Sequence, residues 1–252
     1  MITLRDIKPG SRGNALRAGR PYAEGRQSAP MLRVIYGFAA ATLAAGFVAA
    51  SATGAQPQDA ELSLNARLLE FSKQKDAARV RKVVEQGAAV NSRNRRGETP
   101  LMLWVKAGDA EMVAWLIGKG ADVNQAAVDQ TTPLMAAAYA GRADIMRALL
   151  DAGAEPDRQD QVFKTAMIYA AGEGHVEAVR LLLDRGVDVN RVYAHNLTAL
   201  MWAAGYGRTD CVRLLLERGA DPRPQDDRGK TARDIAREQG FPDTAALLPG
   251  GA

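Results

Sequence analysis

Side chains that could support catalysis or metal binding are few in this chain. It contains two histidines, His175 and His195, and one cysteine, Cys211. No second histidine or cysteine lies at metal-ligand spacing from either histidine. A nucleophile–histidine site would have to be assembled from one of these histidines with Cys211 or with scattered serines. We therefore predict that the chain is not an enzyme and has no catalytic site, no metal site and no cofactor.

Carboxylates and glycines that resemble site residues have a structural explanation. Asp122, Asp188 and Asp221 recur at corresponding places in a repeat described below, so each is interpreted as a turn-forming residue. The segment Gly172-Glu173-Gly174 is not a phosphate loop, because it connects two predicted helices rather than a strand and a helix. Cys211 takes the place of Ile145 in an earlier repeat, which indicates a buried apolar thiol rather than a nucleophile.

A period of 33 residues organises the chain. Three sets of residues keep this step: Thr99, Thr132, Thr165, Thr198 and Thr231; Gly108, Gly141, Gly174, Gly207 and Gly240; and Gly87, Gly120, Gly153, Gly186 and Gly219. Three residue classes locked to one period identify a tandem repeat and exclude most single-core enzyme folds.

The residues of one period predict two short helices and a loop. Thr99 can cap a helix, and Pro100 follows at the first helical position, where its missing N–H costs little. Gly108 permits the turn that ends this helix. A second helix places Met112, Val113, Leu116 and Ile117 on one face. Neither helix can bury its apolar face alone, so the units must stack.

The repeat resembles the ankyrin repeat family. The motifs that carry the resemblance are Thr132-Pro133-Leu134, Gly174-His175 and Gly186-Val187-Asp188-Val189-Asn190, and the resemblance covers about residues 62–248. It implies an all-α solenoid of about six helix-turn-helix units with hairpin-like loops, and a structural role for His175. The family's histidine after Thr-Pro-Leu is replaced by Met102, Met135, Ile168 and Met201, which substitutes apolar packing for a hydrogen-bonding group.

The unit boundaries are expected near 62–93, 94–126, 127–159, 160–192, 193–225 and 226–252, and together they form a domain of residues 62–252. The first and last units are interpreted as caps. Lys75 stands where the other units have the inter-helix glycine, and the last unit is polar where the others are apolar.

Residues 1–55 are predicted to be a leader with a signal peptide, and residues 56–61 a short linker. Residues 34–52 are apolar and uncharged, they follow Arg33, and they end in small residues. Met31 is therefore expected to be the true start, and cleavage is expected after Ala52 or Ala55. The alternative is an uncleaved signal anchor, since 19 apolar residues can span a bilayer. The expected location is the periplasm or outside the cell, with an inner-membrane anchor as the alternative.

The leader also accounts for the basic charge. Residues 1–55 hold seven basic and two acidic side chains, which leaves 26 of the 33 basic and 27 of the 29 acidic residues, a net charge of −1. The exported part therefore lacks the basic footprint of a nucleic-acid-binding protein. The cluster Arg93-Asn94-Arg95-Arg96 is a local exception and is interpreted as a solvated loop tip.

Candidate binding residues follow from the resemblance. Ankyrin-repeat partners usually contact the loop tips and the end of the first helix, on the concave face. Carrying these positions over gives Tyr139, Val162, Leu197, Tyr206, Val128, Asp129, Lys164, Glu173 and His195. Tyr139, Val162, Leu197 and Tyr206 are apolar or aromatic, as the centre of a protein-binding surface requires. Scattered exposed hydrophobic residues are the alternative. Tyr169 and Trp202 are expected in the core.

The predicted function is a monomeric, non-catalytic protein–protein interaction module exported to the periplasm. Its partner is another protein rather than a nucleic acid, and a membrane is involved only if the signal remains uncleaved. A binding module secreted onward to act on a foreign cell, and a membrane-tethered adaptor, are the alternatives.

Overall fold

The computed structural model describes residues 63–249, so the expected signal peptide, its cleavage sites and the linker lie outside the described residues. The described part is helical and contains no strand, which confirms the all-α prediction. The helices are α1 (Leu64–Lys73), α2 (Ala77–Glu85), α3 (Pro100–Ala107), α4 (Ala110–Gly118), α5 (Pro133–Tyr139), α6 (Ala143–Asp151), α7 (Ala166–Glu173), α8 (Val176–Asp184), α9 (Ala199–Gly205), α10 (Thr209–Glu217), α11 (Ala232–Glu238) and α12 (Pro242–Ala246), with a short 3₁₀ helix η2 (Ala194–Asn196).

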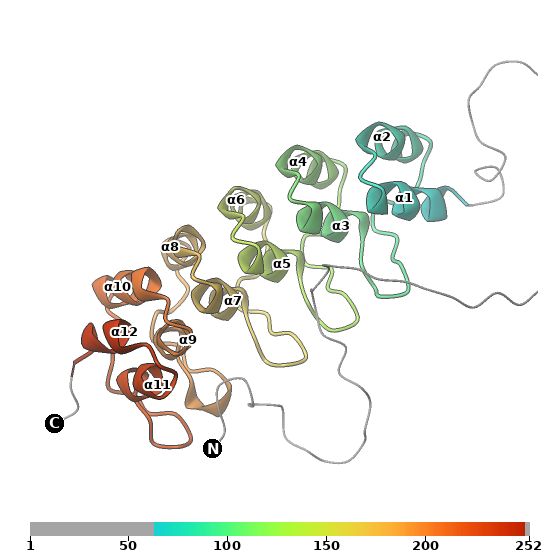
Figure 1. Ribbon diagram of the computed structural model, residues 1–252. Helices are drawn as coiled ribbons and strands as arrows, with labels where there is room; N and C mark the ends of the chain where they lie inside the picture. Colours follow the sequence, from blue (N-terminus) through green and yellow to red (C-terminus); the bar gives the residue numbers. More distant parts are fainter. Residues whose placement is uncertain (1–62, 250–252) are drawn as a thin grey trace, which may run out of the picture.

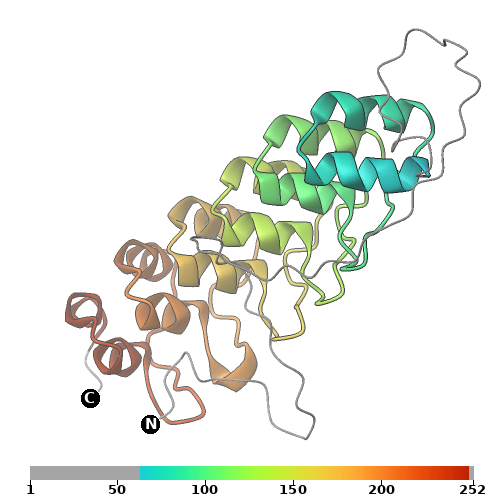
Figure 2. The same ribbon diagram turned by 45° about the vertical axis from the view of Figure 1, so that its right-hand side comes forward.

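The helices form two parallel rows (Figure 1). The first-helix row contains α1, α3, α5, α7, α9 and α11, and the second-helix row contains the even-numbered helices. Each helix of the first row packs against the next one in that row and against its own partner in the second row. The loops between successive pairs project from the first-helix row on one side of the stack (Figure 2). Each pair of helices from α1–α2 to α11–α12, together with the loop that precedes it, is called a unit, and the units are numbered 1 to 6 below.

The threonines of the 33-residue period cap the first helices. The hydroxyl of Thr99 accepts a hydrogen bond from the backbone N–H of Met102 at 3.2 Å, and Thr132 caps α5 in the same way. Thr165, Thr198 and Thr231 repeat this contact at α7, α9 and α11. Each hydroxyl relieves one of the unpaired N–H groups of a first turn. The helices begin where the sequence predicts because these caps recur with the period.

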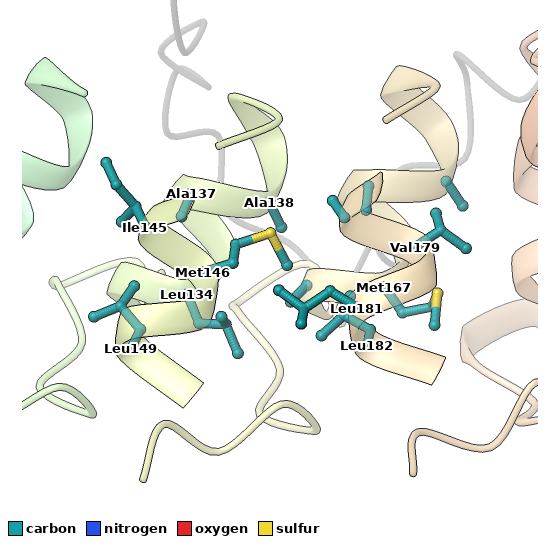
Figure 3. Packing of buried hydrophobic residues seen from close by; sticks show 14 of the residues in the cluster. Leu134, Ala137, Ala138, Ile145, Met146, Leu149, Met167, Val179, Leu181 and Leu182 are labelled. Atoms are coloured by element: carbon teal, nitrogen blue, oxygen red, sulfur yellow. The ribbon is translucent and has the colours of Figure 1, made fainter. Parts of the chain in front are cut away.

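The core is one continuous apolar layer between the two rows. In Figure 3, Leu134 from α5 and Ile145, Met146 and Leu149 from α6 interdigitate, and Met167, Val179 and Leu182 repeat the pattern in the next unit. These side chains are buried. The residues at the family's histidine position, such as Met102 and Met135, are also buried, which confirms the expected apolar packing there.

Asparagines in the first half of three loops connect neighbouring units. Asn91 donates to the carbonyl oxygen of Gly120 at 3.1 Å and accepts from the backbone N–H of Asp122 at 2.8 Å. Asn124 and Asn190 make the same pair of bonds to the following unit. The corresponding residue between them is Asp157, which cannot donate as an amide does and instead pairs with Arg191 at 2.6 Å.

Unit 1 departs from the pattern at its turn and in its core. Lys75 takes the left-handed conformation, with φ 60°, in place of the glycine of other units. Phe71 and Trp104 occupy equivalent positions on α1 and α3, where later units have alanine, and both are buried. Bulky side chains therefore fill the space between the first helices of units 1 and 2. In later units, alanine at this position lets the first helices pack more closely.

Candidate functional site

Carboxylates in the loops stabilise turns by accepting hydrogen bonds from the backbone, as the sequence predicts. Oδ1 of Asp122 accepts from the backbone N–H of Asn124 at 2.9 Å, and Asp188 and Asp221 do the same two residues on. At the loop tips, Oδ1 of Asp160 accepts from the N–H groups of Val162 and Lys164, both at 2.9 Å. These carboxylates are engaged with backbone and are explained without a catalytic role.

Backbone hydrogen bonds align the tips of neighbouring loops. The N–H of Val128 donates to the carbonyl of Arg96 at 2.9 Å, and the N–H of Gln161 donates to the carbonyl of Asp129 at 3.0 Å. The backbone N–H of Asp227 likewise donates to the carbonyl of His195 at 3.2 Å. Side chains at these tips therefore stand beside one another along the stack.

Exposed large apolar side chains gather in the middle of the stack. Within residues 63–249 they are Val128, Tyr139, Val162, Phe163 and Val192, each 41–59% exposed. All five lie in units 3 and 4 or in the loop that follows unit 4, at loop tips or at the end of α5. The second-helix row carries none of this set in the described residues. Exposure confined to one face distinguishes this set from hydrophobic residues scattered over a surface.

Phe163 stands at a strained backbone position. Its φ is 60°, in the left-handed region that a bulky residue rarely adopts. Units 2 and 6 place Gly97 and Gly229 at the corresponding position, with φ 74° and 73°, while units 3 and 5 place Gln130 and Asn196 there, with φ 63° and 54°. Glycine would relieve the strain in unit 4 too, yet this tip carries an exposed phenylalanine. Strained residues of this kind cluster at ligand-binding sites.

Four aromatic rings line the first-helix row beside these tips. Tyr139 and Tyr169 meet edge to face with ring centroids 5.8 Å apart, and Trp202 and Tyr206 stack at 5.9 Å. Lys164 joins the two pairs, with its Nζ 5.5 Å from the Tyr169 centroid and 4.7 Å from that of Trp202. These contacts fall within the range of cation–π interactions. We call Tyr139, Tyr169, Trp202 and Tyr206 the aromatic row.

The aromatic row corrects one expectation from the sequence. Tyr169 and Trp202 were expected in the core, but both are only half-buried and rest on the core with one face. The hydroxyl of Tyr169 donates to Oδ2 of Asp160 at 2.5 Å, so its polar end turns toward the loop. Both rings belong to the surface that the loop tips border.

Leu197 is the candidate residue that the structure contradicts. The sequence predicts an exposed apolar side chain, yet Leu197 is 1% exposed and lies in the core cluster. Its backbone carbonyl accepts from Tyr193 at 2.8 Å, which folds the loop back so that the residue before the Thr198 cap faces inward. Leu197 therefore has no place in a binding surface.

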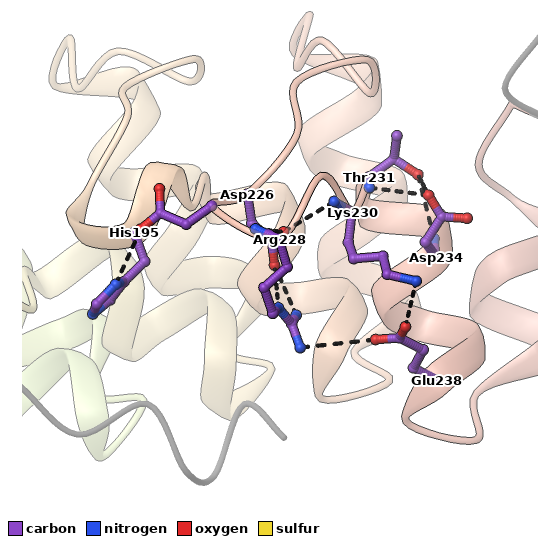
Figure 4. Close-up of polar contacts among 8 residues, drawn as sticks. His195, Asp226, Arg228, Lys230, Thr231, Asp234 and Glu238 are labelled. Atoms are coloured by element: carbon purple, nitrogen blue, oxygen red, sulfur yellow. Dashed lines mark hydrogen bonds and ion pairs between the residues drawn. The ribbon is translucent and has the colours of Figure 1, made fainter. Parts of the chain in front are cut away.

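The remaining candidate residues lie on the loop and first-helix side. Val128, Asp129, Val162, Glu173 and His195 are exposed. Lys164 and Tyr206 are half-buried. His195, which Figure 4 labels, contacts Asp227 of the neighbouring tip, with Nδ1 and Oδ2 3.2 Å apart. Phe163 and Val192 belong to the same side and were missed by the sequence analysis.

The groups with potential for catalysis occupy structural positions. Nε2 of His175 lies 3.0 Å from the carbonyl oxygen of Tyr139. Cys211 is buried, as predicted, and burial raises the pKa of its thiol to about 11. No cluster of three or more potential metal ligands occurs among residues 63–249. In the same residues, no helix has the length and apolar character needed to cross a membrane.

A comparison with family models settles the family. The model described as "Ankyrin repeats (3 copies)" matches residues 68–160, 157–226 and 192–249. The chain belongs to the ankyrin-repeat family. Ankyrin repeats suggest a protein–protein interaction module, and the family is generally non-catalytic. A search of curated proteins finds no match to this ankyrin-repeat chain.

Proposed function

We propose that this ankyrin-repeat protein is a monomeric, non-catalytic module that is exported to the periplasm and binds another protein there. One observation carries the proposal: the exposed large apolar side chains of the described residues are confined to the loop tips and first-helix side of the central units. Aromatic and aliphatic residues within a polar rim are typical of the centre of a protein interface.

Phe163 supports the same face. A bulky residue held at φ 60° on a loop tip is unfavourable for folding, and 52% of this residue stays exposed in the unbound protein. A partner that covers this ring would bury its apolar surface, which contributes roughly 25 cal/mol of binding free energy per Å² of area removed from water.

The binding proposal is tested by capture from a periplasmic extract with the full chain and with two double variants. Tyr139→Ala with Tyr206→Ala alters the aromatic row, whereas Arg147→Ala with Arg213→Ala alters exposed positions of the second-helix row. Loss of a hot-spot aromatic typically costs about 2 kcal/mol or more of binding free energy. The first variant should lose captured proteins that the second retains. Identical capture by both variants, with unchanged melting, would contradict the proposal.

Export is tested separately by sequencing the N-terminus of the accumulated protein. The proposal expects a start at Thr53 or Gln56, after the small residues that end the apolar run. An intact apolar run in a membrane fraction would instead identify a tethered form.

A further inference from the structure

Two units of the stack contain the same internal ion pair. In unit 2, Oε1 of Glu98 lies 2.5 Å from Nζ of Lys106. In unit 6, Nζ of Lys230 lies 2.7 Å from Oε1 of Glu238 (Figure 4). Each pair joins the residue just before the threonine cap to the residue eight positions later, near the end of the first helix. The signs of the charges are reversed between the units, but the geometry is the same.

Unit 4 has one half of this pair. Lys164 precedes the Thr165 cap, and the residue eight positions later is Gly172, which has no side chain. Trp202 and Tyr206 approach the glycine instead, with atoms 3.9 and 3.8 Å from the place of a Cβ atom. Among the described residues, no carboxylate oxygen lies within the 4.0 Å limit of an ion pair with Lys164.

The surroundings of Lys164 make an unpaired ammonium unfavourable. The side chain is half-buried between the rings of Tyr169 and Trp202. Burial lowers its pKa, while the more distant charges of Asp160 and Glu173 oppose that shift. The oxygens of Asp160 are already engaged by two backbone N–H groups and the Tyr169 hydroxyl. A partly desolvated cation of this kind gains most from a direct carboxylate contact.

We propose that Lys164 receives the carboxylate of an aspartate or glutamate in a partner's chain, and that apolar residues on both sides of that acid lie on the aromatic row. This inference rests on the proposed function and names the chemistry of its partner. Tyr139 at the end of α5 and Tyr206 directly after α9 stand on either side of α7, so a segment that touches both continues past Lys164 in both directions. The acid is therefore internal to the segment rather than a chain terminus.

The local charges favour a carboxylate over a phosphate. One ammonium between two rings offers a single positive charge, whereas phosphate recognition typically relies on clustered arginines. Glu173 and Asp129 are exposed on the same side and would repel a dianion more strongly than a monoanion.

The test uses a library of random dodecapeptides displayed on phage at the N-terminus of a coat protein, so that no displayed peptide has a free C-terminus. The library is selected on the full chain, and affinities of enriched peptides are measured by fluorescence anisotropy. We expect an internal Asp or Glu flanked by apolar residues. Lys164→Met, or replacement of the peptide's acid by its amide, should weaken binding about ten- to one-hundred-fold, as for a hydrogen bond to a charged group. Lys230→Met, the matched change in unit 6, should leave the affinity unchanged.

A second pair of variants keeps Lys164 in place. Gly172→Glu supplies the internal partner that unit 6 has in Glu238, and a Cβ atom at this position meets only ordinary contacts. Gly172→Gln has nearly the same shape without the charge. The glutamate variant should bind acidic peptides at least several-fold more weakly than the glutamine variant, because its own carboxylate competes for Lys164.

Three results would overturn the inference. Enriched peptides without an acid, or equal binding by the wild-type chain and a normally folded Lys164→Met variant, would exclude a carboxylate contact. Such peptides would leave the proposed function standing if Tyr139→Ala with Tyr206→Ala still abolished their binding. Failure to enrich any peptide on the wild-type chain would count against both proposals.

Discussion

The imidazole of His175 occupies the space where a Cβ atom on Gly141 would stand. Its ring atoms lie 2.5–2.7 Å from that position, and its Nε2 is 3.0 Å from the carbonyl oxygen of Tyr139 in the same preceding unit. The residue that follows the inter-helix glycine of one unit therefore packs against the inter-helix glycine of the unit before it. Two later pairs repeat this contact: the side chain of Arg208 lies against Gly174, and the ring of Phe241 lies against Gly207.

Gly141→Ala should destabilise the stack more than Gly153→Ala. Both glycines have positive φ, which costs an alanine about 1–2 kcal/mol. At Gly153 no atom lies within 4 Å of the added methyl group, whereas at Gly141 the methyl group also displaces His175. Such overpacking adds about 1–3 kcal/mol. Urea unfolding measures the difference, and similar losses of unfolding free energy for the two variants would disprove a stabilising contact of His175 with Gly141.

A central core leucine should matter more than the corresponding terminal one. Leu182 in α8 is fully buried, with α6 and α10 packed on either side of its helix. Leu182→Ala should cost about 2–5 kcal/mol of unfolding free energy from lost burial and the cavity left behind. Leu248, two periods later, follows α12 in the last described unit, so Leu248→Ala should cost less. Equal shifts of the urea midpoint would argue against stabilisation by stacking.

Asp226 should contribute stability that depends on pH. Burial raises its pKa, but the N–H of Lys230 and the guanidinium of Arg228, 2.7 Å away, outweigh burial and hold the pKa below its ordinary value. A carboxyl with a depressed folded pKa stabilises the fold above its unfolded pKa of about 3.9, and this contribution is lost as the pH falls through the folded value.

Asp226→Asn should therefore lose about 1.5–3 kcal/mol of unfolding free energy at pH 7, the range for hydrogen bonds to a charged group. The gap to the wild-type chain should narrow as the pH falls below about 4. Thermal melts of both proteins from pH 7 to pH 3 measure this gap, and a constant gap would exclude the charged contact as its cause.

Phe163→Gly should separate folding from binding. Glycine relieves the strain at φ 60°, as Gly97 and Gly229 do in their units. The expected stabilisation is about 1 kcal/mol, or roughly 2–4 °C in melting temperature. Partner capture should fall in the same variant, because an exposed apolar contact is removed. A lower melting temperature with unchanged capture would show that the ring serves the fold.

The sequence allowed the helices, their caps and the core to be predicted because each is specified by residues within one period. Thr165 and Gly174 fix the ends of α7 by local backbone chemistry, and Leu182 marks the buried face of α8. Such features depend on neighbours along the chain, so a single unit suffices to locate them.

The surface was harder to predict because it depends on how a loop folds back. Leu197 and Val162 are both apolar and lie near loop tips, yet one is buried and the other exposed. Phe163 carried a signal in its alignment with Gly97 and Gly229, because a bulky side chain is strained in a conformation for which two other units use glycine. The lack of an ion pair for Lys164 among residues 63–249 is harder to predict, because it requires comparing units through the 33-residue period and, within each unit, residues eight positions apart.

The most direct test of the binding surface is photo-crosslinking in living cells. The full chain is produced with p-benzoylphenylalanine in place of Phe163, an exposed tip residue, or in place of Arg147, an exposed residue of α6 in the second-helix row. We predict that illumination joins a partner protein to the chain from position 163 and not from position 147. An adduct from position 147 alone, or none from position 163 in a normally folded chain, would contradict the assignment of this face.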